Sequence, residues 1–218
     1  AASAGSLVES GFGRIHDGPE HSTMNPPDRD TDDREFRLAL RREMIACRMA
    51  LSPEEHAARS SALRAQLAGV LPSLAGQVFA FCWPVQNAPD LRPLMQTLHA
   101  DGKRIVLPVV VRPGEPLAFR EWWPEQPLVP DRYDIPTPTD GDFLVPQILL
   151  LPVNAFDAAG FRIGYGGGFF DRTLATLSPR PLAIGVGFDF QQVPSTRPQA
   201  YDLPLAMIVT DSALIQPL

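Results

Sequence analysis

The stretch from Ile148 to Arg172 reads ILLLPVNAFDAAGFRIGYGGGFFDR, and it decides how the rest of the sequence is interpreted. It opens with an apolar run of strand length and closes with the start of a helical pattern. The turn between them holds five glycines, namely Gly160, Gly164, Gly166, Gly167 and Gly168. Consecutive glycines let a backbone approach a ligand closely, and the N–H groups at a helix N-terminus attract phosphate oxygens. The segment therefore predicts a nucleotide or phosphate site.

Charged side chains flank this turn. Arg162 and Arg172 could neutralise phosphate charge, and Asp171 could hold a divalent cation. The structural alternative is a tight strand-to-helix connection in which Asp171 only balances the helix dipole. The turn is not a Walker A loop, which needs Gly-Lys-Ser/Thr, because the only lysine of the chain is Lys103. Its spacing also differs from that of a dinucleotide-binding fingerprint.

Composition excludes several classes of protein. The chain has 218 residues, 44% of them hydrophobic, which is enough for the core of one α/β domain. A net charge of −6 argues against a nucleic-acid-binding surface, and no apolar run is long enough to span a membrane. Cys47 and Cys82 form no metal-binding or disulfide pattern, so we expect reduced thiols and a cytoplasmic protein. No histidine lies near the glycine region in the sequence. Phosphoryl transfer suits such a region, because it depends on positioning and charge neutralisation.

Hydrophobic periodicity predicts alternating helices and strands after a tail over residues 1–30 rich in Gly, Ser, Asp and Pro. The remaining residues, 31–218, are expected to form a single domain. The predicted helices cover 32–50, 52–70, 90–98 and 169–177, and the predicted strands cover 77–82, 104–110, 117–122, 148–151, 182–188 and 206–210. The proline-rich segment 124–146 is expected to be loop with one short strand at most. This alternation predicts a largely parallel sheet covered by helices, with ligands beyond the carboxyl ends of its strands.

The sequence AFDAAGFRIGYGGGFFDR resembles the signature of the 5-formyltetrahydrofolate cyclo-ligases, A-F-D-x-x-G-x-R-L-G-x-G-G-G-Y-Y-D-R. Further elements of that family occur in the expected order between about Glu35 and Asp211. They are RLALR at 37–41, SPEE at 52–55, GKRIVLP at 102–108, IPTP at 135–138 and YDLP at 201–204. The resemblance implies a Rossmann-like three-layer α/β/α sandwich of the NagB/RpiA/CoA-transferase type. It also implies conversion of 5-formyltetrahydrofolate and MgATP to 5,10-methenyltetrahydrofolate, ADP and phosphate.

By this resemblance, the residues divide into three groups. The ATP-binding residues would be Arg37, Arg41, Arg162, Gly164, Tyr165, Gly166, Gly167, Gly168, Phe169 and Phe170. The folate-binding residues would be Trp83, Ala88 and Phe170, and the Mg²⁺ ligands would be Asp171 and Asp202. Arg162 and Asp171 would be catalytic. Without the resemblance, Arg37 and Arg41 would be read as a solvated basic face and Asp202 as a turn residue.

Three positions depart from the family pattern, which leaves the ATP half of the expected site nearly complete and alters its folate half. Ala88 stands where a glutamate is usual, Thr137 replaces a frequent glutamate, and Phe169-Phe170 replaces a tyrosine pair. A relative that binds ATP but acts on a different substrate, and a non-catalytic nucleotide-binding protein, are therefore alternatives. The expected partners are ATP and a reduced folate, with no nucleic acid and no membrane, for a monomer or weak homodimer.

Overall fold

A computed structural model describes residues 29–217 of the chain. Residues 1–28, which make up most of the predicted tail, lie outside the described residues, whereas Arg29 and Asp30 belong to the first turn of a helix. The helices are α1 (Arg29–Met49), α2 (Pro53–Val70), α3 (Arg92–Ala100) and α4 (Phe169–Thr176), with short 3-10 turns at Leu71–Ser73 and Asp189–Gln191. Among these residues, no helix has the length and apolar character needed to cross a membrane.

The centre of the fold is a seven-stranded sheet in the order β11-β10-β9-β6-β1-β2-β3. Its strands are β1 (Val78–Ala80), β2 (Arg104–Val109), β3 (Ala118–Trp122), β6 (Ile148–Pro152), β9 (Leu182–Val186), β10 (Met207–Val209) and β11 (Leu214–Ile215). The strands from β10 to β2 pair in parallel, and the two edge strands, β3 and β11, pair antiparallel to their neighbours. The predicted α/β class with a mostly parallel sheet is therefore confirmed.

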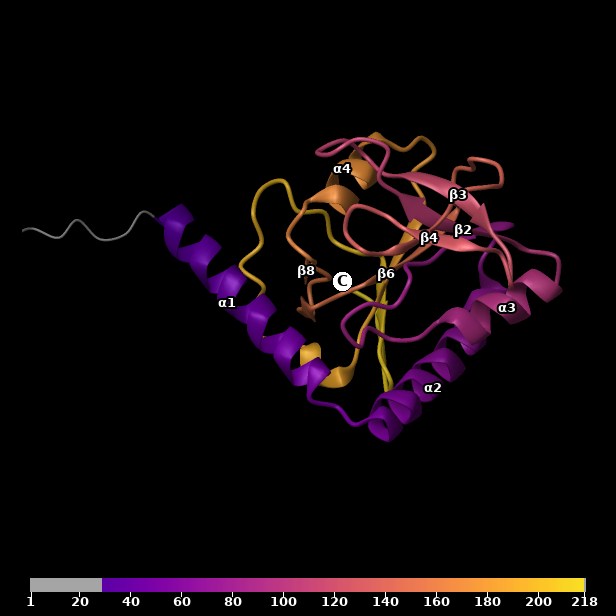
Figure 1. Ribbon diagram of the computed structural model, residues 1–218. Helices are drawn as coiled ribbons and strands as arrows, with labels where there is room; N and C mark the ends of the chain where they lie inside the picture. Colours follow the sequence, from indigo (N-terminus) through magenta and orange to yellow (C-terminus); the bar gives the residue numbers. More distant parts are fainter. Residues whose placement is uncertain (1–28, 218) are drawn as a thin grey trace, which may run out of the picture.

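Alternation along the strands divides the core into two layers. On one face, Phe79, Ile105 and Leu150 pack with Leu63 of α2 and Met95 of α3. On the other face, Ala80, Val106 and Leu149 pack with Leu174 of α4. Because both faces are covered, the parallel strands are nearly continuous in apolar residues. Figure 1 shows α2 and α3 together on one side of the sheet and α4 on the other, as a three-layer arrangement requires.

The helix α2 begins where the sequence predicts. The Ser52 side chain accepts a hydrogen bond from the Glu55 N–H, and the Glu55 carboxylate accepts one from the Ser52 N–H. This reciprocal capping box satisfies two of the N–H groups that a helix leaves unpaired at its start.

The helix α1 lies outside these layers. It packs on the hairpin formed by β7 (Ala155–Phe156) and β8 (Arg162–Ile163), through a small cluster of Leu40, Met44, Ala155 and Ile163. Figure 1 shows it as a long helix set apart from α2 and α3. Because few apolar side chains hold α1 in place, its position depends strongly on polar contacts with the loops beside it.

The sheet reverses its winding direction between β1 and β6. From β1 the chain passes through α3 to β2 on one side, whereas from β6 it passes through α4 to β9 on the other. In open α/β sheets, such a reversal places a ligand-binding crevice at the carboxyl ends of the two strands, between the loops that follow them. One of these loops holds residues 81–91, and the other contains the glycine turn.

The structure differs from the predicted elements in a few places. The helix α1 begins three or four residues earlier than Asp32 or Asp33. The segment 124–146 holds two short strands, β4 (Leu128–Pro130) and β5 (Pro136–Pro138), instead of one at most. The β7–β8 hairpin and β11 were not predicted, because two-residue strands carry no detectable alternation. Asp90 is not the helix cap itself, but its carboxylate accepts a hydrogen bond from the Arg92 N–H at the start of α3.

Candidate nucleotide-binding site

A cavity of about 730 Å³ opens between α1, the glycine turn and the segment around residues 199–202. We call it the arginine cavity. Its walls hold Asp30, Arg34, Arg37, Leu38, Arg41, Pro152, Arg162, Gly164, Tyr165, Gly166, Gly167, Gly168, Phe169, Phe170, Asp171, Arg172, Gln199, Tyr201 and Asp202. Every residue predicted to bind ATP, and both predicted metal ligands, thus line one cavity at the carboxyl end of β6.

The arginine cavity is basic although the protein is acidic. Among its described lining residues, five are arginines and three are aspartates, which leaves two positive charges in excess. The whole chain carries a net charge of −6. A concave surface that gathers one sign of charge attracts ligands of the opposite sign. The cavity therefore favours a polyanion such as a nucleotide triphosphate.

Between Gly164 and Gly168, the glycine turn needs glycine at two positions. Gly166 has φ +96° and Gly168 has φ +62°, in the left-handed region that side chains rarely adopt. A Cβ atom at Gly166 would also lie 3.1 Å from the Arg41 guanidinium. Gly168 is the residue before α4, so the turn delivers the chain directly into a helix N-terminus. The backbone thus presents unpaired N–H groups beside the arginines.

Two arginines hold the turn in this shape. The Arg41 Nε donates to the Gly164 carbonyl at 2.7 Å, and the Arg172 Nη2 donates to the Gly167 carbonyl at 2.6 Å. Burial, and then the charge of Arg37, hold the pKa of Arg41 below its ordinary value. Two guanidinium groups kept this close repel each other, and a bound anion would relieve that repulsion.

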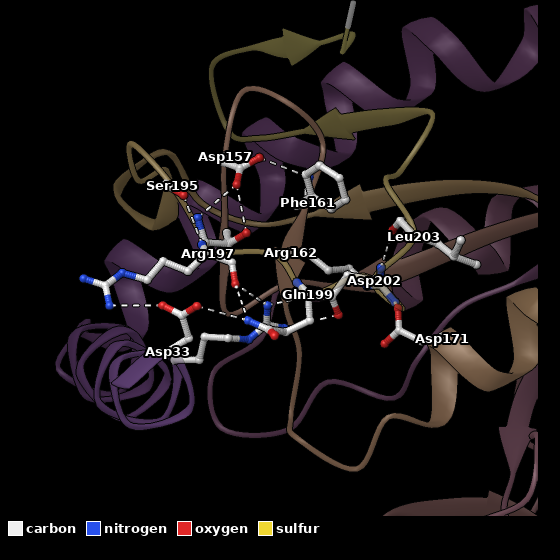
Figure 2. Close-up of polar contacts among 12 residues, drawn as sticks. Asp33, Asp157, Phe161, Arg162, Asp171, Ser195, Arg197, Gln199, Asp202 and Leu203 are labelled. Carbon is white, nitrogen blue, oxygen red and sulfur yellow. Dashed lines mark hydrogen bonds and ion pairs between the residues drawn. The ribbon is translucent and has the colours of Figure 1, made fainter. Parts of the chain in front are cut away.

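Arg37 is fixed by a buried carboxylate. Its Nη1 donates to Asp202 Oδ2 at 2.6 Å and to the Arg197 carbonyl at 3.0 Å, and Asp202 is only 6% exposed. Figure 2 shows neighbouring hydrogen bonds that run from Asp33 on α1 through Gln199 to Asp202. The Gln199 N–H donates to Asp202 Oδ2 at 2.8 Å. This network fastens α1 to the 195–203 segment and holds the Arg37 guanidinium at the cavity wall.

Arg162 and Asp171 form the second ion pair of the cavity. The Arg162 Nη2 donates to Asp171 Oδ1 at 2.7 Å, and its Nη1 donates to the Leu203 carbonyl at 3.0 Å (Figure 2). Arg162 is 5% exposed and Asp171 is 26% exposed. The guanidinium is thus locked in the wall, while the carboxylate at the start of α4 remains accessible to a ligand.

The two aspartates differ in their capacity to hold Mg²⁺. Within residues 29–217, no group of three or more His, Cys, Asp or Glu side chains could hold a metal ion by itself. Mg²⁺, however, is commonly bound through one or two carboxylates together with substrate phosphates. Both oxygens of Asp202 accept hydrogen bonds, whereas Asp171 uses Oδ1 for Arg162 and keeps Oδ2 for another partner. The donor set therefore fits a metal shared with phosphates, with Asp171 as the more available ligand.

The residues predicted to bind the folate are divided between sites. Phe170 lines the arginine cavity together with Phe169, but Trp83 and Ala88 do not. Trp83 lines a second cavity of about 390 Å³, together with Asp90, Arg92, Pro93, Gln96, Trp122, Glu125, Gln126 and Leu128. Ala88 is 1% exposed, and its carbonyl lies 2.9 Å from the His56 ring nitrogen Nε2. Thr137, at another departure from the family pattern, is buried in β5.

Several lining residues were missed by the sequence reasoning. Asp30 and Arg34 lie on the face of α1 that carries Arg37 and Arg41, at spacings of three and four residues. Arg34 lies within the predicted helix, and extending the helical periodicity by one turn would have added Asp30. Gln199 and Tyr201 come from an irregular loop, where periodicity gives no signal.

Known proteins with similar sequences agree with this architecture. The model of the 5-formyltetrahydrofolate cyclo-ligase family matches residues 33–211. The 5-formyltetrahydrofolate cyclo-ligase of Escherichia coli K12 is 31% identical over 173 residues, covering 76% of this chain and 94% of the relative. That of Mycolicibacterium smegmatis is 27% identical, over 78% of this chain and 91% of the relative.

Solved structures give the same result. The NMR structure of Aquifex aeolicus 5,10-methenyltetrahydrofolate synthetase has a TM-score of 0.73 and 25% identity, covering 83% of this chain and 92% of that one. The Mycoplasma pneumoniae synthetase shares the fold, with a TM-score of 0.67 and 23% identity over 80% of this chain and 98% of that one. Since the family model spans most of its length, the chain belongs to the 5-formyltetrahydrofolate cyclo-ligase family of enzymes.

Proposed function

We propose that the protein uses ATP to cyclise 5-formyltetrahydrofolate to 5,10-methenyltetrahydrofolate, with release of ADP and phosphate. The observation that carries this proposal is the arginine cavity, in which five arginines and a glycine turn before a helix line one concave surface. Family membership supplies the folate substrate, and the cavity supplies the chemistry of a triphosphate site.

The reaction needs a better leaving group than a formyl oxygen. In the first step this oxygen attacks the γ-phosphorus of ATP, and the bond to the bridging oxygen breaks to release ADP. In the second step the 10-nitrogen attacks the formyl carbon, loses its proton, and the carbon–oxygen bond breaks to release phosphate. Both steps depend on holding the reacting atoms in line and on neutralising the charge that develops on phosphate oxygens.

The residues of the cavity take separate parts in this scheme. Arg37 and Arg41, fixed by Asp202 and by the glycine turn, bind phosphate oxygens, as does Arg162 beside Asp171. The N–H groups of residues 164–168 and of the first turn of α4 surround the transferred phosphate. Asp171, with Asp202 as the second predicted ligand, would hold Mg²⁺, which neutralises phosphate charge when bound.

A related enzyme with a different substrate is the second candidate. It is favoured by one observation, the placement of Trp83 and Ala88 outside the arginine cavity. Both candidates predict binding of MgATP, which calorimetry measures directly. Only the first predicts that purified protein given MgATP and 5-formyltetrahydrofolate generates the absorbance band of the methenyl product. Nucleotide binding without that band would favour the second candidate. The cytoplasmic location and the monomer or weak homodimer stay predictions.

A further inference from the structure

Arg48, in the last turn of α1, is a fully buried cation. No carboxylate of the described residues forms an ion pair with it. A basic side chain is favoured at a helix C-terminus, but an exposed one would serve that purpose without the cost of losing its hydration. The burial of this guanidinium therefore requires another explanation.

The contacts of Arg48 reach both loops of the crevice. Its Nε donates to the Gln86 carbonyl at 2.7 Å, in the loop after β1. Its Nη2 donates to the Tyr165 hydroxyl at 2.9 Å, in the glycine turn. That hydroxyl in turn donates to the Val85 carbonyl at 3.4 Å. One guanidinium thus joins the loops that follow β6 and β1.

The loop after β1 has a backbone that needs such support. Gln86 has φ +51° and Asn87 has φ +52°, two consecutive non-glycine residues in the left-handed region. Residues persist in this conformation only where their surroundings hold them. The Asn87 Nδ2 donates to the Arg48 carbonyl at 3.3 Å, and the Ala88 N–H donates to the Val85 carbonyl at 2.9 Å. Arg48 and Tyr165 therefore help to hold the shape of residues 85–88.

Tyr165 can act as the connecting group throughout the neutral pH range. Tyr165 as a whole residue is 40% exposed, but desolvation around its hydroxyl raises the pKa of the phenol above the ordinary value, and the opposing influence of Arg48 is smaller. The hydroxyl keeps its proton and donates to Val85 while it accepts from Arg48. Tyr165 stands at the variable position of the family pattern G-x-G-G-G, where the pattern itself does not prescribe a tyrosine.

We propose that Arg48 is a positioning residue that couples the two loops through Tyr165, so that a nucleotide held by the glycine turn also orders residues 85–88. The coupling rests on the proposed function only in taking the nucleotide as the ligand of the arginine cavity. A ligand that orders one loop reduces the conformational entropy that the other loop must still lose when a second ligand binds. Binding of the second ligand is therefore favoured even without a change in mean structure. The effect is reciprocal, so a ligand on residues 85–88 strengthens nucleotide binding.

Amide hydrogen exchange, followed residue by residue by NMR, tests this proposal. The reporter is the Ala88 N–H, which is bonded to Val85 within the loop. In the ligand-free protein, Tyr165→Phe should speed its exchange by about tenfold, since a hydrogen bond to a charged group is lost. Arg48→Lys should do the same, because one ammonium cannot reach both acceptors in the geometry of the guanidinium. The matched control is Tyr133→Phe, which removes a tyrosine hydroxyl that makes no hydrogen bond to a described residue.

The second arm adds a non-hydrolysable ATP analogue with Mg²⁺. In the wild type, exchange should slow both in the glycine turn and at Ala88, whereas in Tyr165→Phe it should slow in the glycine turn alone. Unchanged Ala88 exchange in both variants, or nucleotide protection of Ala88 that survives Tyr165→Phe, would overturn the coupling. If the wild type binds no nucleotide, the proposed function fails, and the ligand-free comparison alone decides whether Arg48 holds the loop. Melting temperatures check that each variant is folded.

Discussion

The two loops of the crevice contrast in how they agree with the family pattern. The glycine turn keeps nearly all of it, and its residues from Gly164 to Arg172, together with Arg162, line one cavity. The loop after β1 departs from it at Ala88, which is buried, and Trp83 and Asp90 of this loop line a second cavity. The residues expected for phosphate transfer are thus nearly all present in this chain, whereas those expected for folate recognition are not. The contrast indicates that the proposed phosphate-binding half and the proposed folate-binding half of the site depart from the family pattern to different degrees.

The largest expected effect belongs to Asp171. Asp171→Asn keeps the size of the side chain and its place at the helix start, but it removes the charge that a hard cation prefers. We expect turnover to fall on the order of 100-fold, with a stability change of about 1 kcal/mol or less. Steady-state rates at varied Mg²⁺ and the melting temperature measure the two effects.

The same measurements distinguish a second role for Asp171, that of holding Arg162. If Asp171 serves only Arg162, turnover falls while the dependence on Mg²⁺ stays that of the wild type. Near-normal turnover at limiting Mg²⁺ would show that the metal is assigned to the wrong residue.

A smaller effect is expected at Arg37. Arg37→Met removes a phosphate contact and leaves the Asp202 carboxylate, which is 6% exposed, without its cation. We expect the dissociation constant for MgATP to rise about tenfold, with a loss of about 1–3 kcal/mol of stability. Calorimetry and thermal unfolding measure these changes.

Arg42→Met is the matched control, because Arg42 is exposed on the same helix. If both variants bind MgATP as the wild type does, the cavity wall formed by α1 does not contact the nucleotide.

The loop after β1 is probed by restoring the residue usual in the family. Ala88→Glu places a carboxylate at a position that is 1% exposed, and we expect a loss of about 3 kcal/mol of stability. The affinity for 5-formyltetrahydrofolate should not rise. Ala88→Gln, of equal size but neutral, separates the cost of the charge from that of the volume. A stable Ala88→Glu variant with tighter folate binding would show that the loop retains the family's role.

The smallest expected effect in this comparison concerns the two cysteines. Cys82 is partly buried, and desolvation raises the pKa of its thiol to about 12, so at pH 8 only about one Cys82 in ten thousand is a thiolate. Cys47 is exposed on α1. A thiol reagent should therefore modify Cys47 rapidly and Cys82 slowly in the native protein. Equal rates at both cysteines would show that the start of the loop after β1 is open to solvent.

The sequence predicted the elements that have strong local signals. The capping box of Ser52 and Glu55 and the apolar run at 148–151 were sufficient to place α2 and β6. The family resemblance, now confirmed, brought Arg37, Arg162 and Asp171 together although up to 134 residues separate them.

Other features could not be predicted, because they depend on tertiary contacts. The hydrogen bonds of Arg48 to Gln86 and Tyr165 join residues 38 and 117 positions away, and no local pattern marks them. The β7–β8 hairpin is too short for alternation to be detected. The position of Trp83 in a second cavity depends on how α3 and β3 pack around it.

The central claim is most directly tested by mixing the purified protein with 5-formyltetrahydrofolate and MgATP. Absorbance of the methenyl product and release of ADP are followed together. The account predicts that the band appears with one ADP formed per methenyl group, and that neither forms when ATP is omitted. Absence of the band at every pH, in a protein that still binds MgATP, would contradict the assignment of 5-formyltetrahydrofolate as the substrate.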